Sequence, residues 1–181
     1  MRLKFYGSIL IALFLNLGFM QAQVIINEFS ASNYTGVQDN FGETEDWMEL
    51  YNAGTTTVDL AGYFLSDNID NPLKWVFPPG VSINPGQQLL IFLSDRDLIA
   101  GTTIHAGFKL TQSKQEWIVL TDPNEVLLDA VQLTNPTQVN HSRGRVTDGS
   151  ASWGIFLNPS PGGSNGNAFE EYASKPVLSL E

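Results

Sequence analysis

The stretch EDWMELYNAG, residues 45–54, decides the fold class. Its side chains alternate in character with a period of two, so that Trp47, Glu49 and Tyr51 share one face and the aliphatic residues between them share the other. Successive side chains of a β-strand point to opposite sides. The alternation therefore predicts a strand within a sheet, and the polar turn that follows closes it.

The strand could bury either of its two faces. Burial of the aliphatic face would leave Glu49 in water, whereas burial of the aromatic face would remove about 150–250 Å² of surface from water for each large ring. We therefore expect Trp47 and Tyr51 to face inward, with Glu49 beside them in need of a buried partner. Arg145, in a late strand, is the partner we expect. This interpretation, a core strand with one satisfied carboxylate, is favoured over an acidic active site.

The same alternation recurs in short segments separated by Gly, Pro, Asn and Asp. The apolar run at residues 87–95 is typical of a strand buried on both faces. Residues 123–125 and the pair Asp148-Gly149 predict hairpin turns. No long segment carries a helical stripe, so we expect an all-β fold, an antiparallel β-sandwich or small barrel. The expected strands lie within residues 24–32, 46–52, 58–67, 73–78, 87–95, 116–122, 126–133, 142–146 and 152–156.

Residues 1–22 are predicted to be a signal peptide. Arg2 and Lys4 precede the apolar run ILIALFLNLGFM, and Ala22 is the expected cleavage site. The run is too short for a comfortable membrane span, although an uncleaved anchor is the alternative. We expect a domain that is secreted or displayed at the cell surface and begins at Gln23.

The composition excludes several classes of partner. Cleavage removes two cations and no acid, so the net charge passes from −10 to −12. A chain this acidic is repelled by nucleic-acid backbones and by anionic lipid surfaces, so we expect neither as a partner. The chain has no cysteine. Its hydrophobic core must therefore stabilise the exported domain without disulfides, which favours a bacterial export route.

The composition shifts at residues 158–167, NPSPGGSNGN, a segment typical of a linker. We place the β-sandwich at residues 23–165, and the linker with the start of a truncated second β domain at residues 166–181. The final KPVLSLE has the pattern of an opening strand with nothing to pair against. The alternative is a tail that packs on the sandwich.

Seven segments spread over residues 24–165 together resemble a bacterial lamin-tail domain, in the family's order and at its usual spacing. The resemblance implies an immunoglobulin-like β-sandwich in the N-terminal part of an exported multidomain protein. SKPVLSLE is also similar to the start of a small β domain that precedes a spore-coat protein H kinase-like domain in such proteins. The seven segments are INEFSASN, DWMELYNAG, VDLAGYFLSD, KWVFPPGVSINPGQQLLIF, FKLTQSKQEWIVLTDP, GRVTDGSASW and NPSPGGSN.

Motifs of catalysis are missing from the sequence. It contains no nucleophile elbow, no phosphate-binding loop and no zinc-binding spacing of its two histidines, so we expect no catalytic residue and no cofactor. Asp39, Glu43, Glu45 and Asp46 are candidates for a calcium site, because Ca²⁺ takes many oxygen ligands. The spacing of an EF-hand is absent, and a solvated acidic loop explains the same residues.

The four tryptophans raise carbohydrate binding as a further alternative. Trp47 and Trp117 lie within apolar strands and are expected in the core. Trp75 and Trp153 border turns and are the pair expected to be exposed.

The sequence predicts a non-catalytic, exported module for adhesion, tethering or contact with a protein or cell-surface polymer, made through the loops at one end of the sandwich. The alternative is an N-terminal accessory domain of a longer exported enzyme, a hydrolase or spore-coat kinase-like protein, whose catalytic part lies outside this chain. Calcium-assisted glycan binding is a third hypothesis.

Overall fold

The computed structural model describes residues 23–168 and residue 172. The predicted signal peptide and most of the predicted second domain lie outside these described residues. Within them, no helix has the length and the apolar character needed to cross a membrane. Strands make up the fold, together with one turn of 3₁₀ helix, η1 (Gln112–Lys114).

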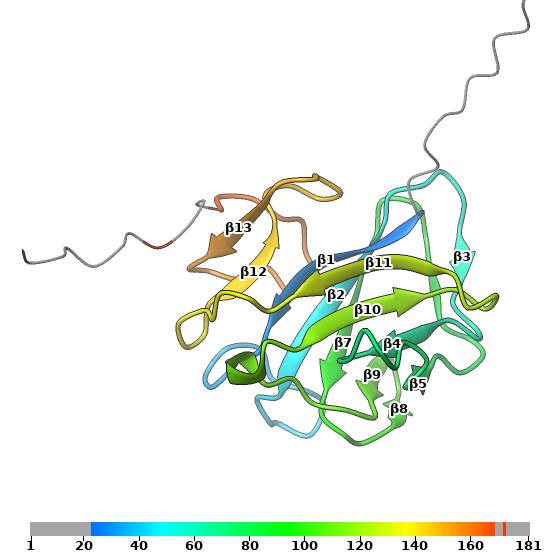
Figure 1. Cartoon of the computed structure of the whole chain (residues 1–181), viewed down its shortest axis with the longest axis horizontal. Helices are drawn as coiled ribbons and strands as arrows, with labels where there is room; N and C mark the ends of the chain where they lie inside the picture. The colour runs from blue at the N-terminus through cyan, green and yellow to red at the C-terminus, as the bar shows by residue number, and fades with distance from the viewer. Residues whose placement is uncertain (1–22, 169–171, 173–181) are drawn as a thin grey trace, which may run out of the picture.

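The larger sheet has seven strands in the order β13-β12-β1-β2-β7-β9-β8 (Figure 1). Its neighbouring strands are antiparallel except β7 and β9, which run parallel with Ile91 opposite Ile104. β8 pairs antiparallel with β9 and forms the edge of the sheet. The strands are β1 (Val24–Ser30), β2 (Asp46–Asn52), β7 (Gln88–Leu93), β8 (Leu98–Ala100), β9 (Thr103–Ala106), β12 (Ser142–Arg145) and β13 (Trp153–Phe156).

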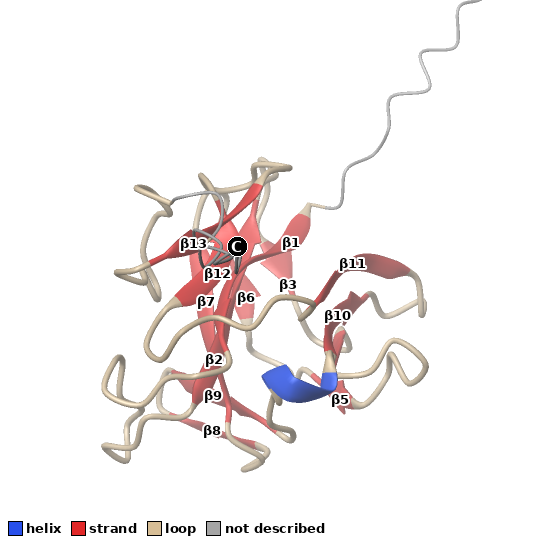
Figure 2. Ribbon diagram, turned by 60° about the vertical axis from the view of Figure 1, so that its left-hand side comes forward, coloured by secondary structure: helices blue, strands red, loops and turns tan. Residues whose placement is uncertain are grey.

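The smaller sheet has the order β11-β10-β4-β5, and β3 pairs separately with β6. Figure 2 shows β5, β10 and β11 as a layer beside β2, β7 and β9. The predicted all-β, immunoglobulin-like sandwich is therefore confirmed, as are the hairpins β10–β11 and β12–β13. The strands outside the larger sheet are β3 (Val58–Asp59), β4 (Phe64–Ser66), β5 (Trp75–Val76), β6 (Ser82–Ile83), β10 (Trp117–Thr121) and β11 (Leu127–Gln132).

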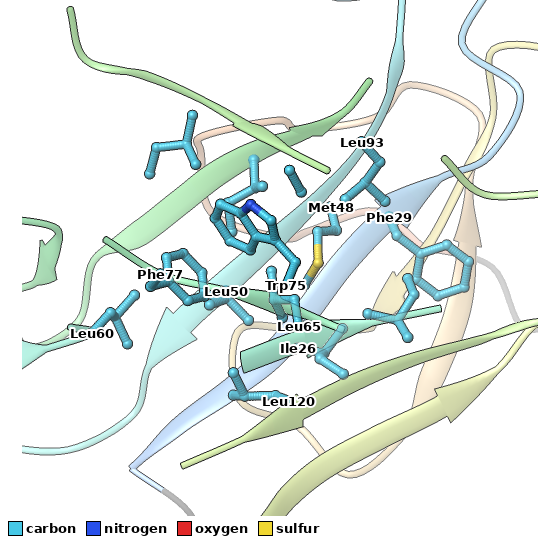
Figure 3. Close-up of a cluster of buried hydrophobic side chains, with 14 of the residues drawn as sticks. Ile26, Phe29, Met48, Leu50, Leu60, Leu65, Trp75, Phe77, Leu93 and Leu120 are labelled. Carbon is cyan, nitrogen blue, oxygen red and sulfur yellow. The ribbon is translucent and has the colours of Figure 1, made fainter. Parts of the chain in front are cut away.

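The hydrophobic core lies between the two sheets, and Figure 3 shows a part of it. Met48 and Leu50 of β2 belong to this cluster, together with Leu65 and Leu120 of the smaller sheet. The aliphatic face of β2 is thus the face that meets the second sheet. The prediction that its aromatic face points into the core is wrong.

The aromatic face of β2 is nevertheless covered. Trp47 is 1% exposed and lines a small hollow with Pro159 and Pro161, while Tyr51 is half-buried. β2 therefore buries side chains on both sides, because residues 158–165 lie over the outer face of the larger sheet. When both faces of a strand are buried, the alternation of its side chains does not show which face meets the other sheet.

The prediction of exposed tryptophans also fails at Trp75. This residue is 7% exposed and packs edge-on against Phe77, with ring centroids 4.8 Å apart. Trp153 is half-buried against the core, with its ring 5.1 Å from the guanidinium of Arg145. Both residues border turns, but the turns lie at sheet edges where a large ring folds inward between the layers.

Candidate functional site

Three of the four predicted calcium ligands lie in the loop before β2, which we call the acidic loop (residues 34–45), and the fourth, Asp46, is the first residue of β2. Asp39 Oδ1 accepts the backbone N–H groups of Phe41 and Glu43, at 2.8 and 2.9 Å. Asp39 Oδ2 accepts from Arg96 Nη1 at 2.9 Å. Burial alone would raise the pKa of Asp39, but these hydrogen bonds and the Arg96 charge outweigh burial and hold the pKa below its ordinary value. Asp39 is therefore a loop-closing carboxylate.

The neighbouring acids are also paired with cations. Glu43 lies 2.6 Å from Arg96, and Glu45 lies 3.0 Å from Lys109. Asp46 stands apart, and burial raises its pKa to about 6. Within the described part of the chain, no group of three or more acidic, His or Cys side chains has the arrangement of a metal site. The structure gives the calcium hypothesis no geometric support, because Arg96 and Lys109 already pair with Asp39, Glu43 and Glu45.

One histidine lies buried behind the acidic loop. His105 of β9 makes ring-nitrogen hydrogen bonds with Ser94 Oγ at 2.9 Å and Asn40 Oδ1 at 2.8 Å. Its ring stacks on Phe92 and tilts against Phe41. Burial lowers the pKa of His105, so the neutral ring is the form that fits this setting. These contacts attach the acidic loop to the larger sheet.

A second group of acids lies on the outer face of the larger sheet. The register of β1 against β2 shifts between Ile26 and Glu28, which makes Asn27 the extra residue of a β-bulge. The bulge lets Ile26 and Phe29 both join the core although three positions separate them. It also sets Glu28 directly opposite Glu49 on the neighbouring strand.

Glu28 and Glu49 bind the segment that covers them, which we call the strap (residues 158–165). Ser160 donates its hydroxyl to Glu28 Oε2 at 2.8 Å, and Gly162 donates its backbone N–H to Glu49 Oε2 at 2.7 Å. Asn165 of the strap is also buried. The linker-like composition of residues 158–167 therefore does not make the strap a loose connection, because its polar groups satisfy buried carboxyl groups of the sheet.

Burial has the largest influence on the pKa values of Glu28 and Glu49. It raises the pKa of Glu28, against hydrogen bonds from Ser142 and Ser160. It raises the pKa of Glu49 to about 8, against hydrogen bonds from Asn27 and Gly162, with help from the neighbouring acid charges. Glu49 is thus a neutral carboxyl group at neutral pH. Because strap and sheet groups engage both side chains, the pair serves as an anchor for the strap.

The expected partnership of Glu49 with Arg145 is not formed. Glu49 Oε1 instead accepts from Asn27 Nδ2 at 2.9 Å. Arg145 points toward the smaller sheet, where it donates to Asp129 Oδ2 at 2.8 Å and to the carbonyl of Ile26 at 2.7 Å. Arg145 therefore joins the two sheets, and a neutral amide compensates the buried carboxyl group.

An apolar groove lies where the edges of the two sheets meet. β5 ends the smaller sheet and β8 ends the larger one, and residues of both line a groove of about 420 Å³, which we call the edge groove. Val76, Leu98 and Ile99 expose 48%, 37% and 40% of their surface there. The complete lining is Trp75, Val76, Pro78, Pro79, Asp97, Leu98 and Ile99.

One hydrogen bond connects the two sides of the edge groove. Trp75 Nε1 donates to Asp97 Oδ1 at 2.7 Å. Asp97 has a left-handed backbone, with φ of 50°, and directly precedes β8. Gly107 lies beneath both residues, since a Cβ at this position would come within 3.2 Å of the Trp75 ring and 3.3 Å of Asp97 Cβ. The indole and the start of β8 are thereby held together.

The rim of the edge groove is acidic. Asp97 lines the groove and is exposed, and Asp95, two positions before it in the chain, is exposed as well. Among the described residues no side-chain hydrogen bond of Asp95 is found. The adjacent cations are already engaged, Arg96 with Asp39 at 2.9 Å and Lys74 with Asp67 at 2.6 Å. The groove therefore presents apolar side chains beside negative charge.

Comparison with known families matches the Lamin Tail Domain model to residues 20–135. The chain belongs to this family. None of the curated proteins compared with the chain matches it. The lamin tail match carries β1 through β11 and the whole edge groove, whereas β12, β13 and the strap follow it in the sequence.

Sequence reasoning missed the edge groove of this lamin tail domain. Leu98 and Ile99 lie outside every strand expected from the sequence, and no local pattern connects them with Trp75. One signal was available in Pro78 and Pro79, because proline is confined to the edges of sheets. It marks residues 73–78 as an edge strand but does not identify the strand across the groove.

Proposed function

We propose that this lamin tail domain is an exported, non-catalytic module that binds a partner protein through the edge groove. The supporting observation is the gathering of Val76, Leu98 and Ile99, all exposed, above the buried Trp75. Exposed apolar side chains that cluster in a polar surround mark interaction surfaces, whereas scattered ones do not. A protein suits this lining better than a sugar polymer, whose many hydroxyl groups need polar partners.

The non-catalytic part of the proposal is supported by the state of the acids. Glu28 and Glu49 have raised pKa values, which is common at active sites, but both are buried and hydrogen-bonded by the strap. The acids of the acidic loop are paired with Arg96 and Lys109. Neither group presents a free carboxylate pair to a substrate.

Export is supported by the sequence of residues 1–22, and it has its own test. We expect protein recovered from the medium or the cell surface to begin at Gln23 when its N-terminus is sequenced. Intact chain confined to the cell interior would contradict export. Contact with a protein outside the cell would make the domain an adhesion or tethering module.

Photocrosslinking tests the binding site in the full chain. A photoreactive amino acid replaces Ile99, and the chain is produced in its native cells and irradiated. We expect one discrete crosslinked protein, lost when Val76→Glu is added. The control position is Val126, which is 55% exposed in the turn before β11, the strand at the opposite edge of the smaller sheet from β5. Equal crosslinking from both positions, or none from Ile99, would overturn the groove as the binding site.

A further inference from the structure

We infer that the occupant of the edge groove is an extended segment of the partner protein, carrying apolar residues and Lys or Arg, which adds to β8 as a new strand. This inference rests on the proposed function and specifies the class of partner. It follows from three properties of the groove: the open edge of β8, the prolines after β5 and the uncompensated acids at the rim.

The edge of β8 is open to strand addition. Among the strands of residues 23–168, β8 pairs with β9 on one side and is the last strand of its sheet. An edge strand leaves one row of backbone N–H and C=O groups without a partner strand, and an extended peptide can pair with that row. The side chains that β8 exposes beside this row are Leu98 and Ile99.

The opposite wall of the groove does not accept a strand. β5 has two residues and is followed by Pro78 and Pro79. Proline lacks a backbone N–H and so interrupts any ladder along that edge. The two walls therefore have different roles: β8 offers backbone pairing, while Trp75, Val76 and the prolines offer an apolar surface.

An added strand has to be apolar on the side that faces the groove. Alternate side chains of a strand point the same way, so every second residue would lie over Val76 and the prolines. The groove of about 420 Å³ has room for these side chains. The residues between them would face solvent and can be polar.

The rim selects for positive charge. Asp95 and Asp97 are exposed, and the neighbouring cations Lys74 and Arg96 are paired with other acids. A carboxylate without a cationic neighbour attracts Lys or Arg of a partner, and the acidic domain strengthens the attraction over longer range. An acidic segment would be repelled by the same charges.

Selection from a random peptide library displayed on phage tests the inference. The library is panned on the full chain, and phage that also bind the Ile99→Glu variant are removed. We expect the surviving peptides to combine alternating apolar residues with Lys or Arg. Peptides rich in proline or in acids, or an empty selection, would overturn the inference.

Matched variants then separate the contributions of the apolar lining and of the acidic rim to peptide binding. We expect Ile99→Glu to weaken a selected peptide about tenfold or more, a change of about 1.4 kcal/mol. Asp95→Asn with Asp97→Asn removes both charges but retains side chains that tolerate the left-handed backbone and can accept from Trp75. We expect this double variant to weaken binding several-fold and reduce its salt dependence. Val126→Glu is the control and should bind as the original chain does.

Backbone pairing has a separate readout. Peptides N-methylated at single positions are titrated onto the domain, and we expect alternate positions to lose binding, since only every second N–H faces the ladder. Loss at every position or at none would overturn strand addition. An Ile99 crosslink with a failed peptide selection would sink this inference alone, whereas loss of the crosslink would sink the proposed function as well. Thermal melts confirm that each variant is folded.

Discussion

The backbone N–H of Gly162 donates to Oε2 of Glu49 at 2.7 Å, although 113 positions separate the two residues. This bond attaches the strap to the centre of the larger sheet, on the side opposite the core. It explains how β2 buries an acid next to Trp47 without an ion pair. It also makes the stability of the sandwich depend on a group that titrates near neutral pH.

We expect the free energy of unfolding to fall as the pH rises toward 8. Burial raises the pKa of Glu49 from 4.5 to about 8, so the folded domain holds a proton that the unfolded chain releases. Stability from this group is fully present below pH 4.5 and is lost as the pH rises through 8. Above the ordinary His105 pKa of 6.5, that histidine is neutral in both states.

The informative window is therefore pH 6.5 to 8. We expect the free energy of unfolding to fall by about 1–2 kcal/mol across this window, measured by urea unfolding at a series of pH values. Glu28 adds a loss of the same sign, since its pKa is also raised. Stability that rises across this window would contradict the buried neutral state of Glu49.

Glu49→Gln isolates the contribution of this carboxyl group. Its amide carries no titrating proton, so we expect the decline across the window to be smaller. Asn27 Nδ2 and the Gly162 N–H both donate to Glu49, and a Gln side chain can accept with only one of its atoms. We therefore expect the variant to be less stable by about 1–3 kcal/mol on the acid side. An undiminished slope would assign the titration to another group.

Substitution of Asn165 tests whether the strap is integral to the domain. Its Nδ2 donates to the carbonyls of Arg145 at 2.7 Å and Asn27 at 3.2 Å. We expect Asn165→Ala to cost about 1–3 kcal/mol, and Asn165→Asp to cost more because a carboxylate would face two carbonyl oxygens. Ser164→Ala loses a 3.3 Å contact with Gln88 and a side-chain hydrogen bond with Asp148, and should cost less than either change at Asn165. Chemical denaturation compares them, and equal values for all three would indicate a loose linker.

Gly107→Ala should destabilise the edge groove. The added Cβ would lie 3.2 Å from the Trp75 ring and 3.3 Å from Asp97 Cβ, closer than ordinary contacts. We expect a loss of about 1–3 kcal/mol, with weaker binding of the selected peptides. Gly166→Ala is the matched control, because its Cβ would meet nothing within 4 Å. Thermal melts of both variants followed by circular dichroism distinguish them. Identical curves would show that the surroundings of Gly107 accommodate the added methyl group without strain.

Two changes at Asp39 separate charge from hydrogen bonding. Asp39→Asn keeps an oxygen for the N–H groups of Phe41 and Glu43, and loses the charge and the acceptor oxygen that face Arg96. We expect it to cost up to about 1 kcal/mol, and Asp39→Ala to cost about 1–2 kcal/mol more. The comparison uses urea unfolding. Equal losses would mean that the ion pair, not loop closure, is the contribution of Asp39.

Calcium should leave the melting temperature unchanged. Arg96 and Lys109 lie within 3.0 Å of the acids that would have to bind the ion. A ligand that binds the folded state raises the melting temperature, so a titration with millimolar CaCl₂ is a sensitive check. A rise with CaCl₂ that MgCl₂ does not reproduce would restore the calcium hypothesis.

The strands and their turns could be predicted because they depend on local patterns. Alternation in residues 46–52 predicts β2, and Asp148-Gly149 predicts the hairpin of β12 and β13, where Gly149 has a φ of 74°. A strand's period and a turn's backbone angles are properties of adjacent residues. The family resemblance in these segments led to the same sandwich.

The sequence by itself determined the fold class of this protein, since alternation and turn chemistry act between neighbours in the chain. Only the tertiary structure decided which face of β2 meets the core, that the strap covers Glu28 and Glu49, and that Arg96 pairs with Asp39 and Glu43 of the acidic loop. It also brought Trp75 beside Ile99 from another sheet. These outcomes depend on contacts between residues far apart in the chain, and composition cannot specify which distant groups will share a buried space.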